Sequence, residues 1–188
     1  MFRGALIKLI FLILVVLAPC CTRRSNRFGY DPKWDLATDI YNNEIGKTVF
    51  PQLKREKNLN VCESGFGLRS SDKIRCMHCG FQYFNEITLE EARQLLVDTA
   101  NLYLKTINKN EGIRPFLENY PFRLENIEIR IFINNPTGLK YNPDKLGAIS
   151  IIDGILEYMA NDRHLTTIYE ETYDEALSKL GTVVVSKE

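Results

Sequence analysis

Apolar residues recur along most of this chain at spacings that separate helices from strands. Over 89–107 they recur every three or four positions, which predicts an amphipathic helix with one buried stripe. Thr88 and Glu91 stand at the start of this stretch in the order of a capping box, in which each side chain satisfies an end amide of the helix. The pattern therefore predicts both the helix and its first residue.

Two further helices are predicted from weaker periodicity. One covers 35–57, where Gly46 and Pro51 divide or end it, because glycine is a poor helix former and proline lacks an amide hydrogen. The other covers 167–180, with Glu170 in its cap and a glycine after its last turn.

Strict alternation of apolar and polar residues predicts strands in the second half of the chain. Isoleucines occupy every second position of 126–134, as in a strand with one buried face. Strands over 146–152 and 155–160 are joined by Asp153-Gly154, two residues that tolerate the positive φ of a tight hairpin turn.

A hairpin is also predicted in the first half, with strands over 60–69 and 73–84. Gly65 and Gly67 in its first strand indicate a bulge or a close backbone approach. The order of elements is then roughly α-ββ-α-βββ-α, with hairpins in place of helical crossovers. This order predicts an α+β domain in which helices cover an antiparallel sheet.

The N-terminal pattern differs from the rest because it is continuously apolar over 9–18 and follows two positive charges, Arg3 and Lys8. A membrane-spanning helix needs roughly 20 apolar residues, about twice the length of this run. A basic start, a short apolar run and a cysteine predict a secretory signal peptide over 1–19. An uncleaved membrane anchor is the alternative.

The end of the apolar run, Leu17-Ala18-Pro19-Cys20, resembles the lipobox of bacterial lipoproteins, whose cysteine receives diacylglycerol and becomes the new N-terminus. Pro19 departs from that pattern, so cleavage of an ordinary signal near Ala18 stays open. We expect lipidation at Cys20, a polar and basic tether over 20–32, and a single domain over 33–188. The residue after Cys20 is not the aspartate that retains lipoproteins at the inner membrane, so the outer membrane is favoured.

Composition narrows the class of function. Lysine and arginine number 24, as do aspartate and glutamate, and two of the basic residues lie in the signal. The exported chain would be slightly acidic, which argues against nucleic-acid binding because that affinity depends on neutralising phosphates. An apolar content of 45% excludes general disorder. The expected partner is a membrane, reached through the lipid, and no cofactor is expected.

Cysteine provides the most pointed chemical motif. Cys76 and Cys79 form a Cys-x-x-Cys pair with His78 between them, as in thiol–disulfide oxidoreductases of the periplasm. Such enzymes place the first cysteine at a helix N-terminus, which stabilises its thiolate. Here the residues after Cys79 predict a strand, and the nearest predicted helix begins only at Thr88. The redox enzyme is therefore the alternative to a binding or structural role.

Two other roles for the cysteines stay open. Cys62, Cys76 and Cys79 with His78 contain enough ligands for zinc, but one Cys-x-x-Cys without a second pair is weak evidence for a metal site. In an oxidising compartment a disulfide from Cys62 to Cys76 or Cys79 would cross the predicted hairpin. His164 is the only other histidine and lies in no nucleophile motif, so no catalytic residue and no metal site is predicted.

Four segments carry a resemblance to a known group: Phe81–Phe84, Leu89–Asp98, Ile113–Phe122 and Asn126–Phe132. With the residues between and after them, they make this chain similar, over a little more than half its length, to small uncharacterised lipoproteins of chlamydia-related and some other Gram-negative bacteria. The resemblance implies export and lipid attachment. It implies no activity, so no functional residue is carried over.

Overall fold

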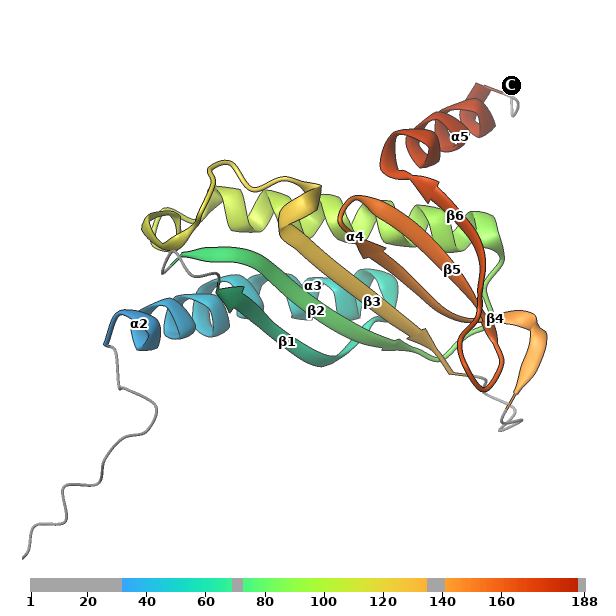
Figure 1. Ribbon diagram of the computed structural model, residues 1–188, viewed down its shortest axis with the longest axis horizontal. Helices are drawn as coiled ribbons and strands as arrows, with labels where there is room; N and C mark the ends of the chain where they lie inside the picture. Colours follow the sequence, from blue (N-terminus) through green and yellow to red (C-terminus); the bar gives the residue numbers. More distant parts are fainter. Residues whose placement is uncertain (1–31, 69–72, 135–140, 186–188) are drawn as a thin grey trace, which may run out of the picture. The chain divides into compact units, whose positions relative to one another are not determined.

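The computed structural model describes residues 32–68, 73–134 and 141–185 (Figure 1). The chain divides into two units, Met1–Pro32 and Lys33–Glu188, and the fold below is that of the second unit. Its elements, in chain order, are α2 (Pro32–Ile40), a π-helical turn (Tyr41–Gly46), α3 (Lys47–Lys57), β1 (Asn60–Leu68), β2 (Ile74–Tyr83), α4 (Leu89–Lys109), two 3₁₀ turns (Arg114–Phe116, Leu124–Asn126), β3 (Ile127–Ile133), β4 (Asn142–Ile152), β5 (Ile155–Asn161), β6 (Thr167–Thr172) and α5 (Tyr173–Val185). The expected α+β class is confirmed.

The strands form one six-stranded sheet in which spatial order follows chain order, β1 to β6. Neighbours pair antiparallel except β2 and β3, which run parallel. The sheet is thus mixed, whereas the sequence had predicted hairpins alone. The reason is α4: a helix between two neighbouring strands returns the chain to the edge where the first strand began, so the second strand runs parallel to it.

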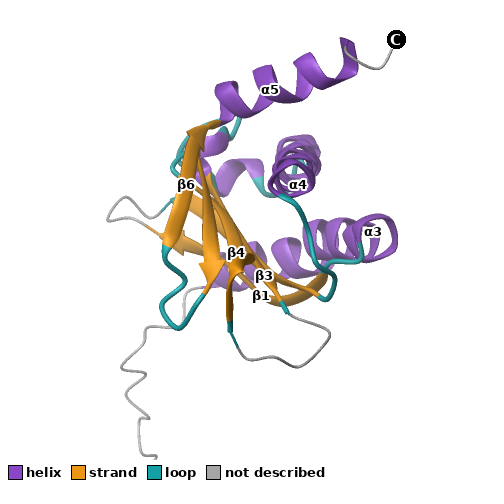
Figure 2. Ribbon diagram, turned by 90° about the vertical axis from the view of Figure 1, so that its right-hand side faces the viewer, coloured by secondary structure: helices purple, strands orange, loops and turns teal. Residues whose placement is uncertain are grey.

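Helices α3 and α4 lie on the same face of the sheet, and Figure 2 shows no helix over the opposite face in the part of the chain that is described. Strand β3 shows the consequence. Its four isoleucines are buried against the helices, whereas Glu128, Arg130 and Phe132 alternate with them on the helix-free face. The hydrophobic core therefore sits between the sheet and α3 and α4.

The predicted capping box at the start of α4 is confirmed. The hydroxyl of Thr88 accepts a hydrogen bond from the Glu91 amide at 3.2 Å, and the Glu91 carboxylate accepts one from the Thr88 amide at 2.9 Å. Because α4 lies between the sheet and its neighbouring helices, it buries a wider arc than the predicted stripe, including Val97 and Ala100.

The division expected at Gly46 and Pro51 is absent. Helices α2 and α3 are joined by the π-helical turn, and Gly46 keeps helical angles (φ −61°, ψ −45°). Pro51 lies inside α3, where it lacks the amide that would bond the carbonyl of residue 47. The irregularity is therefore a wider helical turn just before the proline, and the helix does not break.

Both predicted hairpins are present. A Cβ on Gly65 would lie 2.9 Å from the His78 ring, so the close approach expected at these glycines is found there. The register also shifts between Gly67 and Leu68, but the extra residue is Arg75 of β2 and not a glycine of β1. Between β4 and β5, Asp153 (φ 49°) and Gly154 (φ 79°) adopt the positive φ predicted for the turn.

The prediction of a helix from Thr167 is wrong. Residues 167–172 form β6, which pairs with β5, because threonine, isoleucine and tyrosine there suit a pleated edge more than a helix. Helix α5 begins at Tyr173, and its cap is formed by Thr172 and Glu175, whose side chains each bond the other's amide at 3.3 and 2.7 Å. The helix also continues past Gly181.

Candidate functional site

The predicted lipidation site, Cys20, lies outside the described residues, as does the tether up to residue 31. Among the described helices, none combines the length and the apolar content that crossing a membrane requires.

The Cys-x-x-Cys pair lies in the middle of strand β2 and not at a helix N-terminus. Successive side chains of a strand point to opposite faces, so residues three apart lie on different sides of the sheet and about 10 Å apart along it. Cys79 faces the helices and is 1% exposed, whereas Cys76 is half-buried on the helix-free side beside Glu128. While β2 stays intact, the two sulfurs cannot join.

The register of the β1–β2 hairpin also bears on the expected disulfide. The cross-strand partner of Cys79 is Ser64 and that of Cys76 is Gly67. Cys62 lies at the irregularity between Val61 and Glu63 and is opposite neither of them. All three cysteines are free thiols in this structure, so the bridge across the hairpin is not formed.

Ionisation is disfavoured at each thiol. Burial raises the pKa of Cys76 to about 12, and the negative charge and hydrogen bonding of Glu128 act in the same direction. Burial also raises the pKa of Cys79 well above its ordinary value. The pKa of Cys62 is raised mainly by burial and secondly by the negative charge of Glu63. A thiol–disulfide enzyme needs the opposite, a lowered pKa at its attacking sulfur.

The two histidines are not brought together. His78 lies in β2 against Gly65, and its backbone carbonyl accepts a hydrogen bond from the Tyr41 hydroxyl at 3.1 Å. His164 lies in the β5–β6 loop, where its amide donates to Asp162 at 2.8 Å. No group of three or more metal-ligating side chains is found within the described residues.

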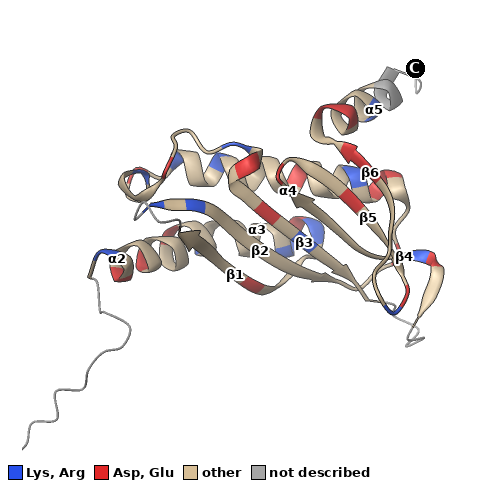
Figure 3. Cartoon of the chain, viewed as in Figure 1, with Lys and Arg blue, Asp and Glu red and all other residues tan. Residues whose placement is uncertain are grey.

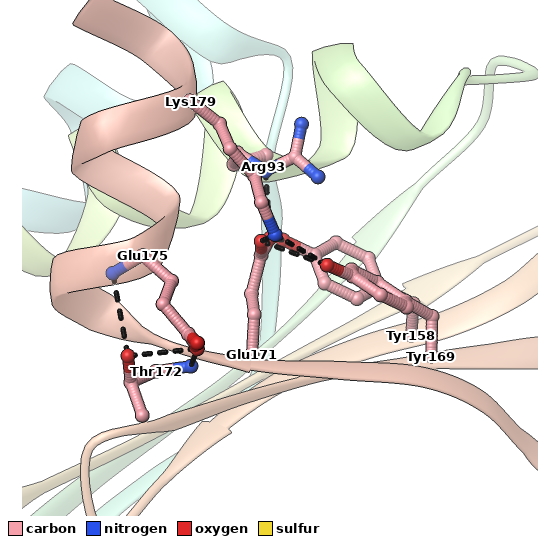
Figure 4. A network of polar contacts seen from close by, with 7 residues as sticks. All are labelled: Arg93, Tyr158, Tyr169, Glu171, Thr172, Glu175 and Lys179. Atoms are coloured by element: carbon pink, nitrogen blue, oxygen red, sulfur yellow. Dashed lines mark hydrogen bonds and ion pairs between the residues drawn. The ribbon is translucent and has the colours of Figure 1, made fainter.

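Within the described residues, one buried cluster of charge was not predicted from the sequence. It surrounds the carboxylate of Glu171 in β6, and Figure 4 shows Arg93 reaching it from α4 and Lys179 from α5. Arg93 Nε donates to Glu171 Oε1 at 2.6 Å, and Lys179 Nζ donates to Oε2 at 2.6 Å. The hydroxyls of Tyr158 and Tyr169 donate to the same carboxylate at 2.7 and 3.3 Å.

The central ion pair of this cluster is buried. The side chains of Arg93 and Glu171 are 8% and 1% exposed, and Lys179, at 43%, is open to solvent. Burial alone would raise the pKa of Glu171, but hydrogen bonds from Arg93, Lys179 and Tyr158 outweigh it and hold that pKa below its ordinary value. Burial and the hydrogen bond to Glu171 raise the pKa of Tyr158.

This arrangement of side chains holds elements of the fold together, and the Glu171 carboxylate is poorly suited to catalysis. Each carboxylate oxygen of Glu171 accepts two hydrogen bonds, so its lone pairs are occupied and it offers no base to a substrate. The cluster ties β5, β6, α4 and α5 together at one end of the sheet. Because the carboxylate is paired with two cations, it can be buried without the large penalty of an isolated charge.

Two signals in the sequence could have revealed this cluster. Arg93 falls four residues after Leu89 and three before Leu96, at an inward position of the apolar stripe. Glu171 lies two residues after Tyr169 in a segment rich in β-forming residues, so a strand assignment would have placed both side chains on the buried face. Each is a single charge at an apolar position, which predicts a buried pair.

Comparison with protein-family models, with curated proteins and with solved structures finds no match to this chain. The resemblance to lipoproteins of chlamydia-related bacteria therefore stays a prediction from the residues that carry it.

Proposed function

We propose that this protein is exported, anchored by lipid at Cys20, and acts in the cell envelope by binding. The observation that carries the proposal is the short apolar run ending in Leu17-Ala18-Pro19-Cys20, which is too short to span a membrane and resembles a lipobox. A polar segment rich in arginine follows, and the second of the chain's two units begins at Lys33. This order suits a domain held at a membrane surface by a tether.

The geometry favours binding over chemistry. The buried charges of Arg93 and Glu171 are used to hold elements together, and the Cys76 and Cys79 sulfurs lie on opposite sides of a strand with raised pKa values. The mixed sheet, in contrast, leaves one face without helices in the described part, and a polar hollow lies between α3 and α4. These surfaces are available for contact with a ligand or partner. The residue after the lipidated cysteine would be Cys21 and not the aspartate that retains lipoproteins at the inner membrane. The proposed location is therefore the outer membrane.

Metabolic labelling with a fatty-acid analogue tests the anchor. The wild type should incorporate the label and enter the membrane fraction, whereas Cys20→Ser should lose the label and become soluble or remain as unprocessed precursor. Cys21→Ser is the matched control, because it removes the neighbouring thiol and should still be labelled.

Equal labelling of wild type and Cys20→Ser would refute lipidation at Cys20. Loss of label only in Cys21→Ser would move the attachment site by one residue. Separation of inner and outer membranes from the labelled wild type then tests the location, and recovery with the inner membrane would contradict it.

A further inference from the structure

A hollow of about 460 Å³ lies between the wall formed by the π-helical turn and α3 and the wall formed by α4. This volume falls in the range of small-molecule sites, roughly 300–1,000 Å³. Leu102 is the one apolar residue among those that line it, and the others are polar or charged. The two walls differ in what they offer to a ligand.

The first wall offers hydrogen-bond acceptors from Asn43, Thr48 and Gln52. Residues five apart come into register in a π-helical turn, so Asn43 lies one turn before Thr48, and Gln52 lies one α-helical turn after it. Asn43 donates its amide hydrogen to Asp39, and Gln52 donates to Glu56 at 3.1 Å. Each amide nitrogen thus gives one hydrogen to a carboxylate that does not line the hollow, and the side-chain carbonyl oxygens are left to accept from a ligand.

The second wall offers cationic donors. Lys105 and Lys109 are exposed and one turn apart on α4, with side-chain roots about 6 Å apart. Neither makes a hydrogen bond or ion pair within the described residues. The one carboxylate among the lining residues, Glu44, follows Asn43 and accepts a hydrogen bond at 2.7 Å from Asn110, the residue after Lys109. The α4 wall thus offers two ammonium groups, and the opposite wall offers neutral acceptors together with Glu44.

We propose that this hollow binds an acidic saccharide, a ligand with hydroxyl groups along one edge and a carboxylate or phosphate on the other. The hydroxyls would donate to the Asn43 and Gln52 oxygens, and the anion would pair with Lys105 and Lys109. An anion without hydroxyls leaves the acceptor wall unused, and a neutral sugar leaves the ammonium groups unpaired. The inference rests on the proposed binding role and names its ligand class.

The helix-free face of the sheet does not suit such a ligand. Strands β1, β3, β5 and β6 carry acidic positions (Figure 3), and those of the first three are Glu63, Glu128 and Glu157. Arg130 lies in their midst and already pairs with Glu128 at 3.6 Å. An anion approaching this face would meet like charge, so the α3–α4 hollow is the favoured position on the described surface.

Calorimetric titration of the full-length protein in non-ionic detergent tests the proposal. The probes are a galacturonic acid trisaccharide, the neutral galactose trisaccharide and acetate. Only the acidic trisaccharide should bind, and added salt should weaken it. The Lys105→Gln/Lys109→Gln variant should bind it at least about tenfold more weakly, as should Asn43→Leu/Gln52→Leu, which removes the acceptors. Arg163→Gln is the matched control, because it removes an exposed cation in the β5–β6 loop and should leave affinity unchanged.

The proposal is overturned if the acidic trisaccharide does not bind, if the neutral sugar or acetate binds as tightly, or if the lysine variant binds like wild type. Thermal melting of each variant checks that the fold is intact. The same titration with Cys20→Ser separates the two proposals. Retained binding with lost fatty-acid label leaves both standing, whereas binding without any label in the wild type refutes the anchor alone.

Discussion

Two regions of the sheet differ in how well the sequence predicts their chemistry. One is the β1–β2 hairpin, and the other is the opposite end, where β5 and β6 meet α4 and α5. The hairpin holds Cys76, His78 and Cys79, the most conspicuous motif in the sequence, yet it separates the two sulfurs and raises both pKa values. The opposite end shows no motif, yet it gathers Arg93 and Lys179 around the carboxylate of Glu171.

The difference shows that position within an element outweighs residue identity. A Cys-x-x-Cys pair is reactive in a helix because the dipole and amides stabilise the thiolate at its N-terminus. In a strand the same spacing places the cysteines on opposite faces. A lone arginine and a lone glutamate become a coupled pair when the helix stripe and the strand alternation point both of them inward.

The largest expected effect comes from removing the buried cation. Arg93→Met should lower the free energy of unfolding by about 3 kcal/mol, because a buried carboxylate loses one of its two cations. Urea unfolding with a common m value measures the loss.

Arg130→Met provides the matched control, since the same substitution on the helix-free face breaks an exposed pair with Glu128. It should cost less than about 1 kcal/mol. A similar cost for both variants would show that the cluster at Glu171 is no more important to stability than a surface ion pair.

The pH dependence of stability tests the same carboxylate. The pKa of folded Glu171 lies below its ordinary value of 4.5, so its stabilising contribution is complete above that pH and is lost as the pH falls through the lower, folded value. Glu171→Gln should therefore be less stable than wild type at pH 7, and the gap should narrow below about pH 4.5. Unfolding free energies between pH 7 and pH 3 measure it, and a gap that stays constant would contradict the assignment.

Much of the fold was accessible from the sequence because local rules and tertiary packing agree there. The capping box of α4, the isoleucine alternation of β3 and the Asp153-Gly154 turn each place residues where their own preferences lead. The parallel pairing of β2 with β3 was not accessible, because pairing partners depend on where α4 packs and not on either strand alone.

The cluster at Glu171 was missed for a related reason. Thr167 and Glu170 have the spacing of a capping box, and so do Thr172 and Glu175, and only the second pair caps a helix. Choosing the first pair turned β6 into a helix and placed Glu171 near a helix start, where a carboxylate needs no partner. The choice between the two capping pairs is decided by the pairing of β6 with β5. That pairing is a tertiary interaction, so the local sequence does not reveal it.

A smaller effect is expected at the glycines of the two regions. Gly154→Val should cost more than about 1 kcal/mol, because φ is 79° there and a β-branched residue is strained at positive φ. Gly67→Val in β1 is the control, since a Cβ there meets no atom within 4 Å and valine suits a strand. Melting curves of both variants measure the difference. An unchanged curve for Gly154→Val would mean that the turn tolerates a side chain.

The smallest effect, none, is expected for the cysteines. Wild type and the Cys76→Ser/Cys79→Ser variant should reduce insulin at the same background rate, because neither thiol ionises near neutral pH and β2 keeps the sulfurs on opposite faces. Alkylation followed by mass spectrometry gives the pH dependence. The rate at Cys76 should keep rising with pH up to about 12, whereas an ordinary thiol levels off near 9.0. Turnover of insulin by the wild type and not by the double variant would establish the oxidoreductase alternative and show that β2 opens to bring the two sulfurs together.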